Sequence, residues 1–367
     1  MRRLPPGYPQ RVRALRGLVV VCALGLVTAC GSSRPELVLP SLPSPSKSVA
    51  PSPVASSATS LTLAFGGDVH FIGRTLPLLD RPETTFGAFA EQLRAADFAM
   101  VNLETAVTGR GSPQPKTYHF RAPVSTYAAI KAAGIDVVSI ANNHTLDYGQ
   151  VGLLDTLDSA AAAKMPVVGA GRNVVEAYEP YVTTVKGVRV GIVALSQVHE
   201  LSEQWKPTAN RPGIAMAFDM GLSLAAVKKA RAMADLVIVY LHWGTEGSNC
   251  PNGEQKSAAR ALAEAGAQVI VGTHAHVPQG DGFLGSAYVH YGLGNFLWYG
   301  PSKSTDTGLL SVTVSDAGGW KVTNRVFTPG VISGTGQARP VTGSALTSMQ
   351  QRLAQANACT GLSRNPS

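Results

Sequence analysis

Two histidines near the C-terminal third of the chain have a spacing that suits a metal site. The apolar run 269–271 is followed by Gly272 and Thr273, and then by His274 and His276. On a segment that turns just past a strand end, this spacing lets two imidazoles approach one small site from different sides. Imidazole is a frequent ligand of Zn, Mn and Fe. The pair alone favours two ordinary loop histidines, so a metal site requires further ligands elsewhere in the chain.

Similar polar groups follow four other apolar segments that are expected to be strands. They are Asp68 and His70 after 61–65, Glu104 after 98–101, Asn142, Asn143 and His144 after 137–140, and His242 after 236–241. In α/β sheets, ligands bind beyond the carboxyl ends of the strands. Five of the eight histidines lie in these five segments. We therefore expect the segments to converge on one site.

The elements that must position these groups alternate between strand and helix. Strands are expected at 61–65, 98–101, 136–140, 166–168, 181–185, 188–195, 236–241, 268–271, 288–291, 309–314 and 320–327, and helices at 86–95, 124–133, 151–163, 222–233, 257–265 and 346–356. Alternation that ends in consecutive strands favours an α/β domain with mixed sheets flanked by helices. This domain is expected at 60–335, and residues 336–367 are expected to form a C-terminal tail.

The first 29 residues have the pattern of an export signal. Five arginines and no acidic residue accompany the apolar run 17–27, which is too short to span a bilayer comfortably. The run ends in Val27-Thr28-Ala29-Cys30, which resembles a bacterial lipobox. We expect acylation of Cys30 to anchor the exported protein at the outer face of the cell membrane. Residues 30–59, rich in Pro, Ser and Ala, are predicted to form a tether.

Charge and cysteine content limit the partners further. The net charge is +8, but without the leader 26 basic residues face 23 acidic ones, which leaves +3. No basic run with interleaved aromatic residues remains, so nucleic acid is not an expected partner. Cys250 and Cys359 are the cysteines left in the body of the chain. An exported protein allows them to pair, but the sequence does not place them within bonding distance.

Six segments, in this order, resemble the CapA-type capsule synthesis family (poly-γ-glutamate biosynthesis), which is related to calcineurin-like metallophosphoesterases. They are residues 67–69, 101–104, 141–149, 242–246, 274–277 and 292–296. The most diagnostic is Ala141-Asn142-Asn143-His144-Thr145-Leu146-Asp147-Tyr148-Gly149. The resemblance covers roughly residues 61–300. It implies a metallophosphoesterase-like layered α/β fold.

The resemblance also implies a site with two divalent metal ions, which would be Mn, Fe or Zn. The ligands expected for the first ion are Asp68, His70 and His276, and those for the second are Asn143, His242 and His274, with Glu104 shared between the two. A shared carboxylate offsets the repulsion between two cations held roughly 3.5–4 Å apart.

Four neighbouring residues receive predicted roles. His144 is expected beside the metals as a general acid or as a stabiliser of developing charge. Asp147 either orients His144 or caps the helix that follows it. Arg74 and Asn142 are the predicted contacts to an anionic substrate, although Arg74 equally fits a salt-bridged loop position.

The leading hypothesis is a surface-anchored, metal-dependent hydrolase or transferase. It would make, attach or trim an anionic extracellular polymer such as poly-γ-glutamate. A general extracellular metallophosphoesterase is the second interpretation, favoured by His70. A third is a non-catalytic assembly component of a membrane polymer synthase, which would use the fold as a scaffold.

Overall fold

The structure, a computed structural model, describes residues 59–367. The predicted signal peptide, the lipidation site Cys30 and all of the tether except Thr59 lie outside the described residues, so these features stay predictions. Within 59–367, no helix combines the length and the apolar character needed to cross a bilayer.

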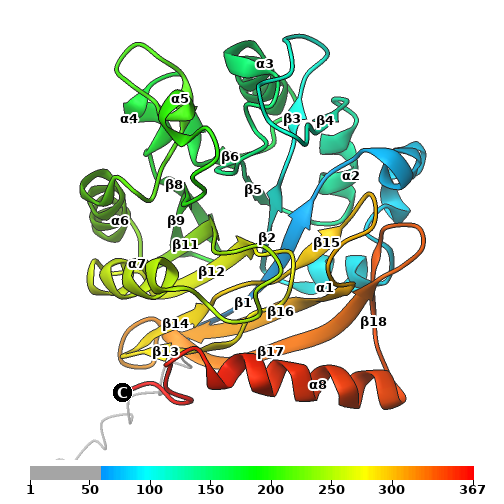
Figure 1. Cartoon of the computed structure of the whole chain (residues 1–367). Coiled ribbons are helices and arrows are strands. Elements are labelled where there is room, and N and C mark those ends of the chain that lie inside the picture. Colours follow the sequence, from blue (N-terminus) through cyan, green and yellow to red (C-terminus); the bar gives the residue numbers. More distant parts are fainter. Residues whose placement is uncertain (1–58) are drawn as a thin grey trace, which may run out of the picture. The chain divides into compact units, whose positions relative to one another are not determined.

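Two mixed β-sheets form the centre of the described chain (Figure 1). The first has eight strands in the order β18-β17-β16-β1-β2-β5-β6, with β15 also paired to β1. The second has six strands in the order β13-β14-β12-β11-β9-β8. Parallel pairs such as β1–β2 and β11–β12 occur beside antiparallel pairs such as β1–β16 and β8–β9. The expected α/β class with mixed sheets is therefore confirmed.

The strands have the following bounds. The first sheet contains β1 (Ser60–Val69), β2 (Phe98–Leu103), β5 (Val137–Ser139), β6 (Val167–Val168), β15 (Asn295–Leu297), β16 (Asp306–Ser315), β17 (Lys321–Ile332) and β18 (Ala338–Pro340). The second contains β8 (Tyr181–Val185), β9 (Val188–Ser196), β11 (Leu236–Trp243), β12 (Val269–His274), β13 (Asp281–Leu284) and β14 (Ala287–His290). Two small pairs are formed by β3 (Ala106–Val107) with β4 (Arg121–Ala122) and by β7 (Ala170–Gly171) with β10 (Gly213–Ile214).

Helices cover the outer faces of both sheets. They are α1 (Ala90–Ala95), α2 (Thr126–Ala132), α3 (Gly149–Ala162), α4 (Val174–Ala177), α5 (Ser202–Trp205), α6 (Met220–Met233), α7 (Gly253–Glu264) and α8 (Gly343–Ala358), with 3-10 turns at Gly73–Asp80, Pro82–Thr84 and Gly87–Phe89. Helices α1, α2 and α3 share a core with one face of the first sheet. Helices α6 and α7 share another with one face of the second sheet. A third core lies between the two sheets.

The strand β11 shows why the sequence folds into these layers. Every residue from Leu236 to Trp243 is buried. Ile238 and Tyr240 belong to the core between the sheets, whereas Val237 and Val239 belong to the core under α6 and α7. A strand buried on both faces needs apolar side chains at every position. The uninterrupted apolar run in the sequence therefore identifies a central strand.

The C-terminal segment differs from the expected tail, because it is part of the domain. Strand β18 pairs with β17, and α8 packs along β17, as Figure 1 shows. A disulfide joins Cys250 to Cys359 just after α8, which settles the pairing that the sequence left open. The prediction failed at β18 because a strand of three residues is too short to show a periodic pattern.

The expected helix at 86–95 is also shorter than predicted. The α-helix α1 begins only at Ala90, and a 3-10 turn precedes it. Gly87 has a φ of 56°, in the left-handed region, which an α-helix does not include. The apolar spacing of this segment continues through the interruption, so the pattern alone does not reveal it.

Candidate metal centre

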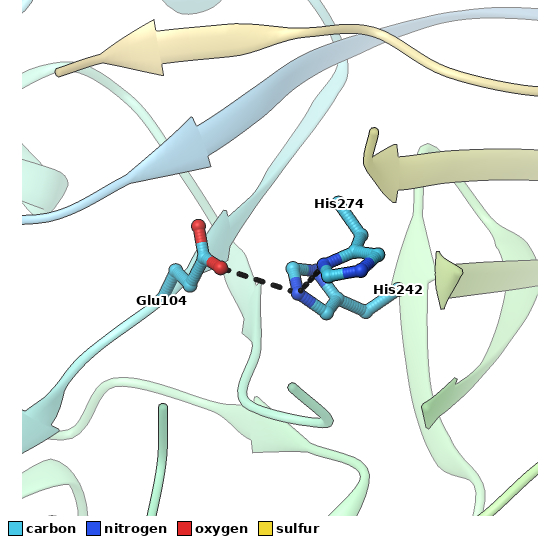
Figure 2. A group of neighbouring side chains, drawn as sticks. All are labelled: Glu104, His242 and His274. Atoms are coloured by element: carbon cyan, nitrogen blue, oxygen red, sulfur yellow. Dashed lines mark hydrogen bonds and ion pairs between the residues drawn. The ribbon is translucent and has the colours of Figure 1, made fainter. Parts of the chain in front are cut away.

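The strand ends of both sheets bring most of the predicted ligands together. Asp68 lies near the end of β1 and Glu104 follows β2, while His242 and His274 lie at the ends of β11 and β12. One ligand atom each from Glu104, His242 and His274 lies within 4.8 Å of the other two. Figure 2 shows the Glu104 carboxylate directed toward the two imidazoles. Asp68, Glu104 and His276 form a second cluster by the same measure.

The first cluster is centred on Nε2 of His242. This atom lies 2.8 Å from Asn143 Oδ1, 3.1 Å from His274 Nδ1 and 3.2 Å from Glu104 Oε1. Nδ1 of the same ring contacts the Thr273 hydroxyl at 3.0 Å. The structure thus brings together the four residues expected around the second metal ion. Imidazole, amide and carboxylate groups are a donor set that suits Zn, Mn or Fe.

The second cluster is organised around the buried Asp68 carboxylate. Its Oδ1 accepts a hydrogen bond of 2.8 Å from the Asn102 amide, and its Oδ2 accepts one of 3.1 Å from the backbone N–H of His274. Oδ2 also lies 3.3 Å from Nδ1 of His276, which contacts Asn295 Oδ1 at 2.9 Å. Both sheets therefore position this carboxylate. Asn295 supports the orientation of His276.

Burial shifts the pKa values of the groups in the metal-free centre. Burial and the charge of Asp68 raise the pKa of Glu104 well above its usual range. Burial also raises the pKa of Asp68, but the hydrogen bond with His276 and the charge of His242 outweigh it and hold this pKa below its usual range. Burial lowers the pKa of His242 to about 3, so that ring is neutral at pH 7. A divalent cation would favour the ionised form of the buried Glu104 beside the neutral imidazole of His242.

Unpartnered atoms test whether these residues fit a metal ion. Among the described residues, neither carboxylate oxygen of the buried Glu104 has a hydrogen-bond partner. Leaving a buried carboxylate without partners costs several kcal/mol or shifts its pKa, as it does here. A divalent cation bound by Glu104 would supply the missing partner. The donor set therefore fits a metal ion.

His70 does not join the arrangement expected for the first metal ion. None of the clusters found in residues 59–367 includes it. Its buried ring packs 4.4 Å from Trp298, 4.5 Å from Phe120 and 4.8 Å from Tyr299, measured between ring centroids. Neither ring nitrogen has a hydrogen-bond partner in the described chain. The aromatic rings hold the imidazole beside the centre, and its role as a ligand stays a prediction.

Glu246 is a candidate ligand for which the sequence left two interpretations open, support of the metal ligands or a solvated loop position. Its carboxylate forms a third cluster with His274 and His276. The residue is exposed on the loop that follows β11. Its position four residues after His242, inside a segment that carries the family resemblance, was the available signal.

The backbone is unusual where the ligands leave the second sheet. His274 and His276 have φ values of 84° and 57°, a region that non-glycine residues rarely adopt. Such conformations persist only where the surrounding structure enforces them, and they cluster at functional sites. On the first sheet, Gly67 allows an equally close approach, because a Cβ there would lie 1.8 Å from the carbonyl oxygen of Gly294.

His144 lies beside the metal ligands and is held by Asp147. Its Nδ1 lies 2.7 Å from Asp147 Oδ2, while its Nε2 lies 3.9 Å from Glu104 Oε1. Helix α3 is preceded by Tyr148 and has no side-chain cap. Of the two predicted roles of Asp147, orientation of His144 is therefore the one that the contacts support. With Nδ1 engaged, Nε2 is the nitrogen directed toward the centre.

Lys116 has a buried side chain in this site and is a residue that the sequence gave no reason to select. Its ammonium lies 2.9 Å from Asp147 Oδ1, 2.8 Å from Glu200 Oε2 and 3.4 Å from His144 Nδ1. Only 1% of its side chain is exposed. Glu200 in turn accepts a hydrogen bond of 3.2 Å from the Asn143 amide. Lys116 thus links Asp147, which holds His144, to Glu200, which holds the candidate ligand Asn143.

Burial and the neighbouring ammonium also set the charge of His144. Burial first, and the positive charge of Lys116 second, lower the pKa of His144 well below its usual range. Burial raises the pKa of Asp147 to about 6, although the charge of Lys116 opposes this shift. The metal-free protein therefore presents a neutral imidazole beside the candidate metal ligands.

The contacts of Arg74 and Asn142 do not support their predicted role in substrate binding. The Arg74 guanidinium donates to the backbone carbonyls of Trp298 and Gly300, at 3.0 and 3.1 Å. The fully buried amide of Asn142 donates 2.9 Å to the carbonyl of Leu103. Both side chains hold the loops around the centre in place. Their role in substrate binding stays a prediction, because the residue type alone does not show which partner takes the hydrogen bonds of a side chain.

Comparison with known families places the chain. The sequence profile described as "Bacterial capsule synthesis protein PGA_cap" matches residues 62–299, which is more than half of the chain. The chain belongs to this family. The match contains all of the candidate ligands from Asp68 to His276.

Two curated members of the capsule synthesis family are similar to this chain. The capsule biosynthesis protein CapA of Bacillus anthracis is 30% identical over 269 residues, which cover 70% of this chain and 65% of that protein. The PGA biosynthesis protein CapA of Bacillus subtilis (strain 168) is 30% identical over 257 residues, which cover 68% of this chain and 67% of that protein. The chain thus spans about two thirds of the length of these relatives.

Among solved structures, the calcineurin-like phosphoesterase YfkN from Bacillus subtilis is similar, with a TM-score of 0.45 and 16% sequence identity. The alignment covers 82% of this chain and 99% of that chain. The family assignment itself rests on the sequence matches.

Proposed function

We propose that this capsule synthesis family member is a metal-dependent hydrolase or transferase that acts on an anionic extracellular polymer such as poly-γ-glutamate. Synthesis, attachment or trimming of the polymer would take place at the outer face of the membrane, where lipidated Cys30 would anchor the protein. The convergence of ligands from two sheets carries the catalytic part of the proposal. The names of the curated relatives support the polymer part. A membrane polymer synthase is the proposed protein partner.

The residues divide into two groups of ligands. Asn143, His242 and His274 would hold one divalent ion, Asp68 and His276 would hold the other, and Glu104 would lie between the two. Bound ions would polarise a substrate oxygen and lower the pKa of a water molecule that attacks it.

Proton transfer falls to His144. Since Asp147 engages its Nδ1, Nε2 of the neutral ring carries a lone pair. It would take up a proton from the attacking water and then, as the imidazolium, deliver that proton to the leaving oxygen or stabilise charge that develops there. Phe120 stacks on the imidazole with ring centroids 3.9 Å apart, which limits rotation of the ring. The arrangement keeps one nitrogen of a neutral imidazole directed toward the candidate ligands.

Metal analysis of the purified full chain tests the proposal. We expect bound Mn, Fe or Zn, located by anomalous scattering at the two clusters, and hydrolysis that requires the metal. His274→Ala should lose metal and activity together. His199→Ala is the matched control, because this side chain is 71% exposed and contacts only Glu254 among the charged groups of the described chain. Absence of metal, or full activity in His274→Ala, would leave the scaffold interpretation.

A general extracellular metallophosphoesterase is the second candidate. The pocket beside the centre favours it, because a single lysine and no arginine line that pocket. A comparison of turnover between oligo-γ-glutamate and small phosphoesters, with added Mn²⁺, separates the candidates. Turnover restricted to phosphoesters and lost in Asp68→Asn would select this second function.

A further inference from the structure

A pocket with aromatic walls opens beside the candidate metal centre. Its volume is about 390 Å³, and its walls include Tyr118, Phe120, Trp298 and Tyr299. The rings form a continuous surface, with centroids 5.2 Å apart for Phe120 and Tyr299 and 5.5 Å apart for Trp298 and Tyr299. Tyr118 is 61% exposed, although large aromatic side chains are usually buried. An exposed ring at the mouth of an aromatic pocket indicates a surface for a bound group.

The pocket is continuous with the groups assigned to chemistry. His144 and His276 both line it. Phe120 stacks on the first imidazole at 3.9 Å, and Trp298 lies 4.5 Å from the second. A substrate group held between the aromatic walls would therefore lie next to the bond that reacts at the metal centre.

The charges of the pocket suit a single negative charge better than a run of carboxylates. Lys303 is its one lysine, and Glu246 contributes the opposite charge. The Lys303 ammonium lies 3.4 Å from the backbone carbonyl of Glu246, and none of the ion pairs in residues 59–367 includes this lysine. A γ-linked glutamate chain carries a carboxylate on each residue and calls for several cations. The pocket offers one such cation, the Lys303 ammonium.

We propose that this pocket binds a ring of the substrate, either aryl or glycosyl. The ring would belong to the group that the reacting ester bond joins to the rest of the substrate. Aromatic side chains bind flat apolar faces, while a few polar groups fix the orientation of a ligand. Lys303 would pair with one negative charge on the ring-bearing group. This inference deepens the second candidate function, phosphoester chemistry at the metal centre, and rests on it, because it names the class of ester that reaches that centre.

Binding of unreactive phosphonates to the full chain loaded with Mn²⁺ tests the inference. Methylphosphonate presents the anionic head alone, phenylphosphonate adds an aryl ring, and a glucosyl phosphonate adds a sugar ring. Titration calorimetry should give a ring preference of about 5- to 10-fold over methylphosphonate. The larger of the two ring preferences identifies the ring class.

The variants Tyr118→Ala and Tyr299→Ala should reduce this preference to within about twofold while the affinity for methylphosphonate is unchanged. Phe218→Ala is the matched control, since Phe218 is 37% exposed and lies outside the pocket. Its ring preference should equal that of the wild type. Tyr118→Leu provides a milder change at the exposed position.

Two results would overturn the inference. One is equal affinity for methyl and ring phosphonates in the wild type, including no binding of either. The other is a ring preference that survives in both tyrosine variants. Failure of the proposed function shows separately, as absence of metal or as activity that persists in His274→Ala. Binding of methylphosphonate without a ring preference leaves the function standing and removes the pocket assignment.

Discussion

The two sheets contribute different chemistry to the same centre. The first sheet supplies oxygen ligands and the second supplies imidazoles: Asp68, Glu104 and Asn143 on one side, and His242, His274 and His276 on the other. Oxygen donors bind hard cations and imidazole binds the later transition metals, so a mixed set suits Mn, Fe or Zn. Neither sheet holds a complete set. The site therefore depends on how the sheets pack.

Specific contacts fix the relative position of the two sheets. The Tyr240 hydroxyl of β11 donates to the backbone carbonyl of Gly66 in β1. The His274 backbone N–H donates to Asp68 across the same interface. Around them, apolar side chains of both sheets form one buried core. Since interiors are close-packed, this core holds the two ligand groups at a defined separation.

The strongest test removes one ligand from each sheet. Asp68→Asn and His242→Ala should each lower metal affinity by at least about 100-fold, because loss of an outer-shell partner alone costs 10- to 100-fold. Activity should fall with the bound metal. Metal content and competition with a chelator measure the effect, and circular dichroism checks the fold. A variant that keeps full metal content would show that its sheet is dispensable.

The disulfide is a covalent link between the loop after β11 of the second sheet and the helix that packs on the first sheet. Cys250 lies on the loop that joins β11 to α7, and Cys359 follows α8, which packs on β17 of the first sheet. Cys250→Ser should lower the free energy of unfolding by about 2–5 kcal/mol, since the bond closes a long loop. Urea unfolding measures the change.

Controls for the disulfide come from the same chain. Cys359→Ser should match Cys250→Ser, and the double variant should add little. A reductant should lower the urea midpoint of the wild type and leave the midpoints of the variants unchanged. An unchanged midpoint in Cys250→Ser would show that the bond does not stabilise the domain.

A substitution at Lys116 should disturb the orientation of His144 without removing a metal ligand. Lys116→Met should lower kcat by about 10- to 100-fold, as expected for loss of a residue that orients the groups around a metal site. KM and metal content should change much less, and Lys116→Arg should recover part of the rate. Lys131→Met on α2 is the control, because the Lys131 ammonium donates to the carbonyl of Ala163, away from the metal centre. Equal damage in the Met and Arg variants would contradict a role in orientation.

A pH dependence separates His276 from the other imidazoles. Burial lowers its pKa, but the hydrogen bond to Asp68 and the charge of Glu104 outweigh burial and raise the pKa to about 9 in the metal-free protein. The stabilisation from this raised pKa is fully present below pH 6.5 and is lost as the pH rises through about 9.

Metal binding requires neutral His276, so the apparent metal affinity should rise about tenfold per pH unit between pH 6.5 and about 9. Chelator competition at three pH values measures the slope. His276→Gln should flatten it. A slope that is unchanged in this variant would assign the released proton to another group.

The sequence predicted the layered α/β class and most strands, because buried strands leave uninterrupted apolar runs and the chain turns polar where they end. It also selected the residues of both ligand groups, since they follow those runs directly. It did not show that Phe120, Trp298 and Tyr299 enclose His70, or that Lys116 reaches Asp147 and Glu200. In the sequence, a polar loop residue that is buried cannot be told from one that is solvated.

The sequence by itself determined which residue types stand at the strand ends and in what order, since those are properties of neighbouring positions. Only the tertiary structure decided which of them meet. Asp68 and the His274 backbone are 206 positions apart, and Cys250 and Cys359 are separated by 109. Such pairs form through the packing of one sheet against the other, and no local pattern carries the information on that packing. The same packing decided that Arg74 and Asn142 donate hydrogen bonds to backbone carbonyls.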